Sequence, residues 1–239
     1  MEVRAINTVV ERDIQEIISD SQIFDAFRGK LILVTGATGL IGSMVARSLI
    51  AANDAYHLSL RVICHVRNIE KAHHMFSDIV DSDILTFVDT PLESLDIACD
   101  YIMHGAAPTK SKYFVEHPVD TIRTSIHGTE RMLELGKEQK IKGMVYLSSM
   151  EQYGVPYESG QVMTEDRIGY LDHLNVRSSY SESKRLCECY CKSYAVEFGV
   201  PVKIARLAQT FGAGVPLDDN RVFMQFTQHA LDGRDIILH

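Results

Sequence analysis

The chain has 239 residues, a formal net charge of −8 and 46% hydrophobic residues. This length and composition suit one globular α/β domain, or such a domain with a small annex, whose core needs no disulfide or metal support. The acidic balance offers no bulk attraction to nucleic acid or to an anionic membrane, so we expect no nucleic-acid partner. The longest apolar runs, such as residues 31–35, are too short to span a bilayer, so we expect no membrane insertion.

The N-terminus and the cysteines favour a cytoplasmic location. The first 22 residues are acidic and amphipathic, and they lack the continuous apolar segment of a secretion signal. The 5 cysteines are an odd number, which indicates reduced thiols. Cys187, Cys189 and Cys191 lack the C-x-x-C spacing, and on a helix only Cys187 and Cys191 share a face. We therefore expect no metal site.

Strand patterns and helix patterns alternate along most of the chain. Residues 2–28 predict one or two short helices, because apolar residues recur there at helical spacing. The strands that follow are expected at 30–36, 60–68, 84–89, 99–107, 143–149 and 201–208. The helices between them are expected at 40–53, 69–79, 118–139 and 179–199, and 150–178 is expected to be a long loop. This alternation predicts an α/β fold with a Rossmann-type doubly wound parallel sheet and helices on both faces.

A glycine-rich turn joins the first strand to the first helix of this pattern. In "TGATGLIG", Gly36 permits a tight turn, and Gly39 lets the backbone approach a pyrophosphate at the helix N-terminus. Gly42 allows the helix to pack closely on the strand. The position between a strand and a helix favours a dinucleotide site, although a plain strand–turn–helix stays open from this motif alone.

A second motif, "YSESK", follows the fifth predicted strand. Tyr180 and Lys184 lie four residues apart and therefore share one face of a helix. An ammonium group near a phenol favours the phenolate, so we expect Lys184 to lower the pKa of Tyr180 and make it a general base. The alternative is a solvated pair on a helix surface.

These motifs together resemble the extended short-chain dehydrogenase/reductase superfamily, and within it the NAD-dependent epimerase/dehydratase family. The resemblance implies Ser149, Tyr180 and Lys184 as catalytic residues, with Ser149 hydrogen-bonded to the reacting sugar hydroxyl. The cofactor contacts that it implies are Gly36, Thr38, Gly39, Leu40, Ile41, Gly42, Arg67, Asp89, Thr90, Ala106, Ala107, Tyr180 and Lys184. The nucleotide-sugar contacts that it implies are Pro108, Gln209 and Arg221. The family's usual Asn is replaced by Ser125, and His104 is expected to be structural.

The resemblance also implies an organisation into parts. We expect an N-terminal helical extension at 1–29, an NAD(P)-binding Rossmann domain at 30–208, and the start of a sugar-nucleotide lobe at 209–239. In the family a further strand and helices follow this point, so we expect part of the sugar site to lie outside this sequence. The paired helices 118–139 and 179–199 make a homodimer the expected assembly.

The residues after Ser149 bear on the reaction. Members of the family oxidise a sugar C4 hydroxyl and then epimerise, dehydrate or decarboxylate. In "SSMEQYG", Met150 stands where the 4,6-dehydratases carry an acid, whereas Glu151 and Arg185 resemble the UDP-glucuronate decarboxylases. We therefore favour decarboxylation, with Glu151 as a further catalytic residue, and keep dehydration and epimerisation as alternatives. Glu151 as a structural carboxylate is an equal alternative.

The cofactor and the class of protein each leave a choice. The second strand ends with Arg67 and Asn68 instead of the Asp that binds the ribose of NAD, so NADP is slightly favoured, although NAD is usual in this subgroup. The alternatives of another class are a non-catalytic NADP-binding regulator and a reductase of small carbonyls.

Overall fold

The centre of the fold is a six-stranded parallel sheet. The computed structural model describes residues 8–79, 84–160, 162–215, 219 and 221–236. The strands are β1 (Leu31–Thr35), β2 (Arg61–His65), β3 (Leu85–Val88), β4 (Tyr101–His104), β5 (Gly143–Ser149) and β6 (Val202–Leu207). Their order is β3-β2-β1-β4-β5-β6, and every pairing is parallel. The predicted doubly wound α/β sheet is confirmed: β5 has the expected bounds, and the other five strands are somewhat shorter than expected.

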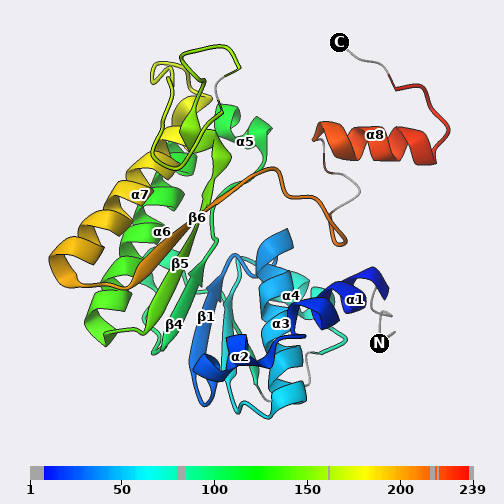
Figure 1. Cartoon of the computed structure of the whole chain (residues 1–239), viewed down its shortest axis with the longest axis vertical. Helices are drawn as coiled ribbons and strands as arrows, with labels where there is room; N and C mark the ends of the chain where they lie inside the picture. Colours follow the sequence, from blue (N-terminus) through cyan, green and yellow to red (C-terminus); the bar gives the residue numbers. More distant parts are fainter. Residues whose placement is uncertain (1–7, 80–83, 161, 216–218, 220, 237–239) are drawn as a thin grey trace.

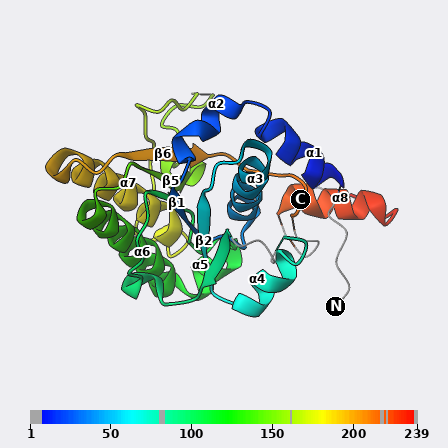
Figure 2. The same ribbon diagram turned by 90° about the horizontal axis from the view of Figure 1, so that it is seen from below.

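Helices cover the sheet on two sides (Figures 1 and 2). The helices are α1 (Thr8–Ile17), α2 (Ser21–Phe24), α3 (Leu40–Tyr56), α4 (Ile69–Met75), α5 (Ser111–Glu116), α6 (Pro118–Gln139), α7 (Ser178–Phe198) and α8 (Val222–Leu231). Figure 2 shows α3 and α4 on one side of the sheet and α6 and α7 on the other. The four longer helices predicted between the strands are present, although α4 ends four residues early. Helices α5 and α8 were not predicted.

The two sides of the sheet form two separate apolar cores. Ile32 and Val34 of β1 pack with α1, α2 and α3, while Leu33 between them packs with α6 and α7. This alternation follows from the strand's period of two, and burial on both faces makes the strand apolar throughout. The continuous apolar run that begins at residue 31 is explained by its place at the centre of the sheet.

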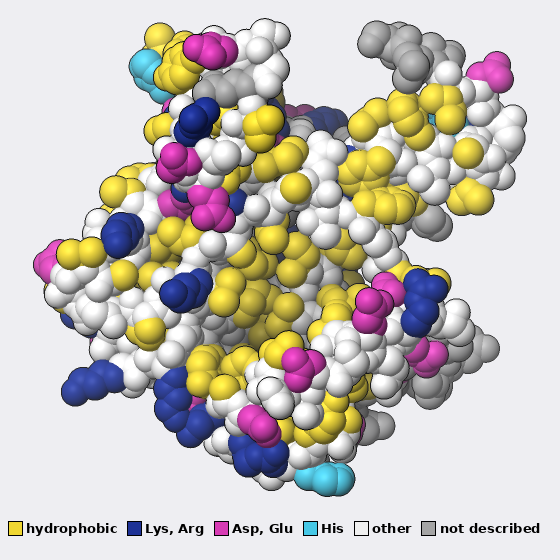
Figure 3. Space-filling view, viewed as in Figure 1, with side chains coloured by type: hydrophobic (Ala, Val, Ile, Leu, Met, Phe, Trp, Pro, Cys, Tyr) yellow, Lys and Arg dark blue, Asp and Glu magenta, His cyan; other side chains and the backbone are white. Residues whose placement is uncertain are grey.

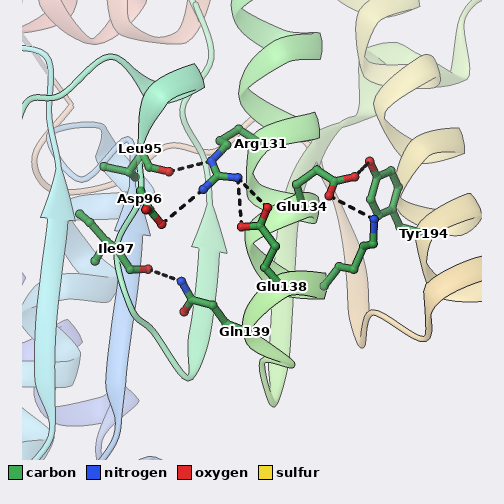
Figure 4. A network of polar contacts seen from close by, with 9 residues as sticks. Leu95, Asp96, Ile97, Arg131, Glu134, Glu138, Gln139 and Tyr194 are labelled. Atoms are coloured by element: carbon green, nitrogen blue, oxygen red, sulfur yellow. Dashed lines mark hydrogen bonds and ion pairs between the residues drawn. The ribbon is translucent and has the colours of Figure 1, made fainter.

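Helix α6 also binds the crossover between β3 and β4 through polar contacts (Figure 4). The Nε atom of Arg131 donates to the carbonyl oxygen of Leu95 at 2.7 Å, and the Nε2 atom of Gln139 donates to that of Ile97 at 2.8 Å. On the other flank of α6, Tyr194 of α7 donates to Glu134. These contacts hold a crossover that contains only a short 3₁₀ turn at Leu92–Ser94.

The long loop predicted at 150–178 is present, apart from a 3₁₀ turn at Met150–Tyr153 and the turn that leads into α7. The Arg185 guanidinium donates to the carbonyl oxygens of Gln152, Tyr153 and Gly169. A single antiparallel bridge joins Val155 to Tyr170. Arg185 of α7 thus ties the start of the loop and Gly169 together just beyond the carboxyl end of β5.

One side of the sheet is incompletely covered near β5 and β6. Val145 lies between Met144 and Tyr146, which pack toward α6 and α7, so its own side chain points to the other face, where it is 38% exposed. Figure 3 shows hydrophobic side chains gathered in a hollow on this face. Among the described residues, no helix is long and apolar enough to cross a membrane.

Candidate active site

The carboxyl ends of β1 and β4 approach each other closely at Gly36. This residue has φ = +72°, and a Cβ atom there would lie 2.7 Å from the carbonyl oxygen of Gly105. Only glycine accommodates both the left-handed backbone and the contact. Gly42 packs directly beneath Gly36, so a side chain there would push α3 away from the strand. The roles expected for both glycines in the turn and in the packing are confirmed.

The same turn presents the start of α3 to solvent. The N-cap residue of α3 is Gly39, which is exposed and has no side chain to cap the first amides of the helix. Thr38, Leu40 and Ile41 are partly exposed around it. Free amides at a helix N-terminus, with no Cβ in front of them, fit the pyrophosphate of a dinucleotide. The residues present therefore fit an NAD(P) cofactor, as the sequence predicted.

A buried hydrogen-bond network supports the segment after β4. The Oγ1 atom of Thr35 lies 2.7 Å from Nδ1 of His104 and accepts from the amides of Gly105 and Ala106, each at 3.2 Å. The Nε2 atom of His104 lies 3.2 Å from Oγ1 of Thr129. Burial lowers the pKa of His104 to about 3, so the ring is neutral and structural at physiological pH.

This network positions residues that the resemblance assigned to ligands. Ala106 and Ala107 are partly exposed, whereas Pro108 is buried. Thr35 was missed in the sequence, although a hydroxyl at the end of an otherwise apolar strand was the available signal. Ser125 donates to the carbonyl oxygen of Thr121 within its own helix, so it supports α6 rather than the site.

The structure brings Ser149, Tyr180 and Lys184 together. Ser149 ends β5, and Tyr180 lies in the first turn of α7, close enough to the Ser149 side chain for that side chain to lower its pKa. The Nζ atom of Lys184 is 5.6 Å from the centroid of the Tyr180 ring and donates to the carbonyl oxygen of Leu147 at 2.7 Å. Because parallel strands end at one edge of the sheet, β5 places this trio at the same edge as the Gly36 turn.

The pKa of Tyr180 is shifted in the direction opposite to our expectation. Burial raises it, the Ser149 side chain opposes the rise, and the Glu151 carboxylate adds to it. Burial also lowers the pKa of Lys184 to about 8, which leaves the ammonium largely protonated at pH 7. The predicted lowering of the Tyr180 pKa is wrong for the site as folded, because desolvation of the phenol outweighs the lowering by Ser149 and Arg177.

Glu151 sits beside the trio in an ion pair. Arg177 Nη2 lies 3.0 Å from its Oε1 atom and 2.9 Å from its Oε2 atom, and Ser181 donates to Oε2 at 3.2 Å. The backbone amide of Glu151 donates to the Ser149 hydroxyl at 3.2 Å. The sequence placed Glu151 near the site, but the partner Arg177 was not predicted.

The residues expected around the adenosine end lie at the ends of β2 and β3. Arg67, Asp89 and Thr90 are exposed, and the Thr90 carbonyl oxygen lies 2.8 Å from Nε2 of His65. The Asn68 side chain accepts from the amide of Lys71 and so caps α4. Arg67 is thereby left as the polar side chain that can meet a ligand at the end of β2.

Two of the residues expected to contact the nucleotide sugar, Gln209 and Arg221, make no hydrogen bond or ion pair with Ser149, Tyr180 or Lys184 among the described contacts. Gln209 is exposed after β6. Arg221 is the N-cap of α8, where its guanidinium holds both carboxylate oxygens of Asp219 and donates to the Thr210 carbonyl oxygen at 3.2 Å. The charge of Arg221 is thus already paired. Within the described part of the chain, no group of three or more His, Cys, Asp or Glu side chains could hold a metal ion.

Comparisons with known proteins identify relatives of this chain. UDP-glucuronic acid decarboxylase 1 of Danio rerio is 30% identical over 215 residues, which are 88% of this chain and 48% of that protein. UDP-glucuronic acid decarboxylase 6 of Arabidopsis thaliana is 32% identical over 206 residues, which are 84% of this chain and 57% of that protein. The chain therefore spans about half the length of these relatives.

Solved structures show the same fold. A UDP-N-acetylglucosamine 4-epimerase of Methanobrevibacter ruminantium has a TM-score of 0.72 at 22% identity, over 88% of this chain and 65% of that one. The dTDP-glucose 4,6-dehydratase DesIV of Streptomyces venezuelae has a TM-score of 0.69 at 22% identity, over 85% and 62%. The profile of the NAD dependent epimerase/dehydratase family matches residues 32–239, and the chain belongs to that family.

Proposed function

We propose that the protein is an NAD(P)-dependent enzyme that modifies a nucleotide sugar by first oxidising the C4 hydroxyl of the sugar. The observation that supports this most is the assembly of Ser149, Tyr180 and Lys184 at the sheet edge that also carries the glycine turn. A regulator that only bound the cofactor would have no need of this trio beside the cofactor turn.

The chain's own residues orient the hydroxyl and move its proton. Ser149 is placed to hydrogen-bond the C4 hydroxyl, and Tyr180 to take its proton as the C4–H hydride leaves. Lys184, fixed by the Leu147 carbonyl oxygen, keeps a positive charge near the resulting phenol. A bound oxidised cofactor supplies the hydride acceptor and a positive charge that favours the phenolate.

Decarboxylation of UDP-glucuronate is the reaction that we favour. The relatives named as UDP-glucuronic acid decarboxylases support it, as do Met150, Glu151 and Arg185 in the sequence. A C4 ketone beside a C5 carboxylate is a β-keto acid: the bond to the carboxyl carbon breaks, CO2 leaves, and its electron pair passes into the enolate. Protonation at C5 and return of the hydride to C4 complete the sequence, which needs no additional acid at position 150.

Three finer points belong to the same proposal. NADP is favoured over NAD, because Arg67 is exposed where an acidic residue would otherwise bind the ribose. A homodimer through α6 and α7 is supported by Ile122 and Leu186, which are 39% and 44% exposed on these helices. A cytoplasmic location is supported by five free cysteines, of which four are buried.

The proposal is tested by offering UDP-glucuronate, dTDP-glucose and UDP-glucose in turn, with NAD or NADP, and identifying products by NMR. Release of CO2 with a UDP-pentose product is the expected result. A 4-keto-6-deoxy product would replace decarboxylation with 4,6-dehydration, and a C4 epimer would replace it with epimerisation. Cofactor binding without turnover of any nucleotide sugar would overturn the enzymatic proposal in favour of a regulator.

A further inference from the structure

Arg177 makes two contacts that converge on the candidate active site. Its Nη2 atom lies about equally far from both carboxylate oxygens of Glu151, at 3.0 and 2.9 Å. Its guanidinium carbon lies 4.8 Å from the centroid of the Phe114 ring. The side chains of Arg177 and Glu151 are 34% and 33% exposed, so the pair is sheltered but reaches solvent. One side chain therefore touches both a carboxylate of the site and an aromatic ring of α5.

Phe114 connects Arg177 to the candidate base. The rings of Phe114 and Tyr180 stack with their centroids 4.3 Å apart and their planes 3° from parallel. The hydroxyl of Ser179, beside Tyr180, donates to the Phe114 carbonyl oxygen at 3.3 Å. Since Phe114 is 1% exposed, its ring has little freedom to move independently of these contacts.

The charges around the Tyr180 ring come from two elements. Helix α7 contributes Arg177 and Lys184, and the turn after β5 contributes Glu151, while α5 contributes the uncharged Phe114. Lys184 is committed to the Leu147 carbonyl oxygen, so Arg177 is the cation in direct contact with Glu151. A carboxylate this close to a phenol opposes its ionisation unless an adjacent cation neutralises it.

We propose that Arg177 is a positioning residue of this site, which neutralises and orients Glu151 and, through Phe114, holds the ring of Tyr180. In this role Arg177 reduces the penalty that the Glu151 charge imposes on the phenolate. In the folded site Glu151 raises the pKa of Tyr180 and Arg177 lowers it, which agrees with this role. The inference rests on the proposed function in one respect, that Tyr180 is the base.

The test is a titration of Tyr180 that needs no substrate. The chain has 10 tyrosines and no tryptophan, so its near-ultraviolet absorbance reports tyrosinate without interference. Subtracting the titration of the matching Tyr180→Phe protein isolates Tyr180 in each background. The backgrounds are the wild type, Arg177→Met, Glu151→Gln and the double variant, with Arg123→Met, an exposed arginine of α6, as the control.

The expected result is a coupled pair of shifts. Arg177→Met raises the pKa of Tyr180 by about half a unit, the scale on which one charge acts across a partly solvated site. In the double variant, Glu151→Gln reverses this rise in the Tyr180 pKa, because the carboxylate that Arg177→Met leaves without its cation is gone. Arg123→Met leaves the titration unchanged. Arg177→Lys, which keeps the charge but not the forked geometry, gives a smaller rise than Arg177→Met.

Two results would overturn the inference. One is an unchanged Tyr180 titration in Arg177→Met; the other is a rise that Glu151→Gln does not reverse, which would make Arg177 a packing residue only. If Arg177→Met does not fold, Glu151→Gln alone must lower the Tyr180 pKa in the wild-type background. The proposed function fails separately, because the coupled shifts can be present in a protein that turns over no nucleotide sugar.

Discussion

The aromatic ring of Tyr180 lies flat against that of Phe114, with centroids 4.3 Å apart and planes inclined by 3°. The contact joins the short helix α5, which follows β4, to the first turn of α7, which follows the long loop. It fixes the orientation of the candidate base from a segment much earlier in the chain. The short helix α5 therefore contributes to the candidate active site, together with the Tyr180–Lys184 motif.

Replacing Phe114 with alanine should strongly destabilise the fold. The ring is 1% exposed, so its loss leaves a cavity, and we expect the free energy of unfolding to fall by about 3–5 kcal/mol. Phe198 at the end of α7 is 43% exposed, and Phe198→Ala should cost no more than about 1 kcal/mol. Urea denaturation of both variants measures the difference. Equal losses would show that the α5–α7 contact does not stabilise the fold.

Substitution of Gly36 separates backbone strain from close packing. Gly36 and Gly199 have nearly the same dihedral angle, φ +72° and +71°, but a Cβ atom at Gly199 meets nothing within 4 Å. Gly199→Ala should therefore cost about 1 kcal/mol of left-handed strain. Gly36→Ala adds a clash with Gly105, and we expect at least about 2 kcal/mol more, together with loss of cofactor binding. Equal costs for the two variants in urea denaturation would contradict the close approach of β1 and β4.

His104 should make the protein sensitive to acid. Burial lowers its folded-state pKa to about 3, below the ordinary value of 6.5, so the unfolded chain binds the extra proton first. The contribution of the neutral ring is fully present above about pH 6.5 and is lost as the pH falls toward 3. Between pH 6.5 and 5 the stability of the wild type should fall more steeply than that of His104→Gln, by up to about 1.4 kcal/mol per pH unit.

Denaturation at several pH values checks this slope. His74→Gln on α4 is the matched control, because His74 is exposed and makes no part of the buried network. We expect the control to keep the wild-type slope. A His104→Gln variant with the wild-type slope would mean that this ring does not stay neutral in the folded protein.

Arg67 should decide between the two nicotinamide cofactors. Its guanidinium is exposed at the end of β2 and can pair with a 2′-phosphate. Arg67→Asp should weaken NADPH binding about tenfold or more and strengthen NADH binding, as followed by nucleotide fluorescence. Arg61→Asp, an exposed arginine at the opposite end of β2, should change neither affinity. Unaltered NADPH binding in Arg67→Asp would remove the basis for NADP preference.

Tyr180→Phe should separate chemistry from binding. The variant keeps the stacked ring but has no hydroxyl to take a proton, so turnover should fall by at least about a hundredfold. Cofactor affinity should stay within about twofold, because the glycine turn is untouched. Tyr190→Phe, on the same helix and only partly buried, is the control that keeps full activity. A fully active Tyr180→Phe enzyme would exclude Tyr180 as the base.

Much of the architecture is encoded locally and could be predicted. The apolar runs that became β1 and β5 are buried on one or both faces, so hydrophobicity constrains most of the sequence there. Gly36, Gly42 and the Tyr180–Lys184 pair follow from backbone angles and helix periodicity, which are properties of a few neighbouring residues. Helix α5, with 6 residues, was missed because short helices depend on packing more than on their own periodicity.

The sequence by itself determined the alternation of strands and helices, the glycine turn and the spacing of the catalytic motif. Only the tertiary structure decided that Thr35 meets His104, that Arg177 holds Glu151, and that the phenol of Tyr180 is desolvated. Thr35 and His104 are separated by 69 positions and Glu151 and Arg177 by 26, so their contacts depend on which strands and loops become neighbours. Charge and burial at the site are therefore consequences of chain topology, which no local pattern records.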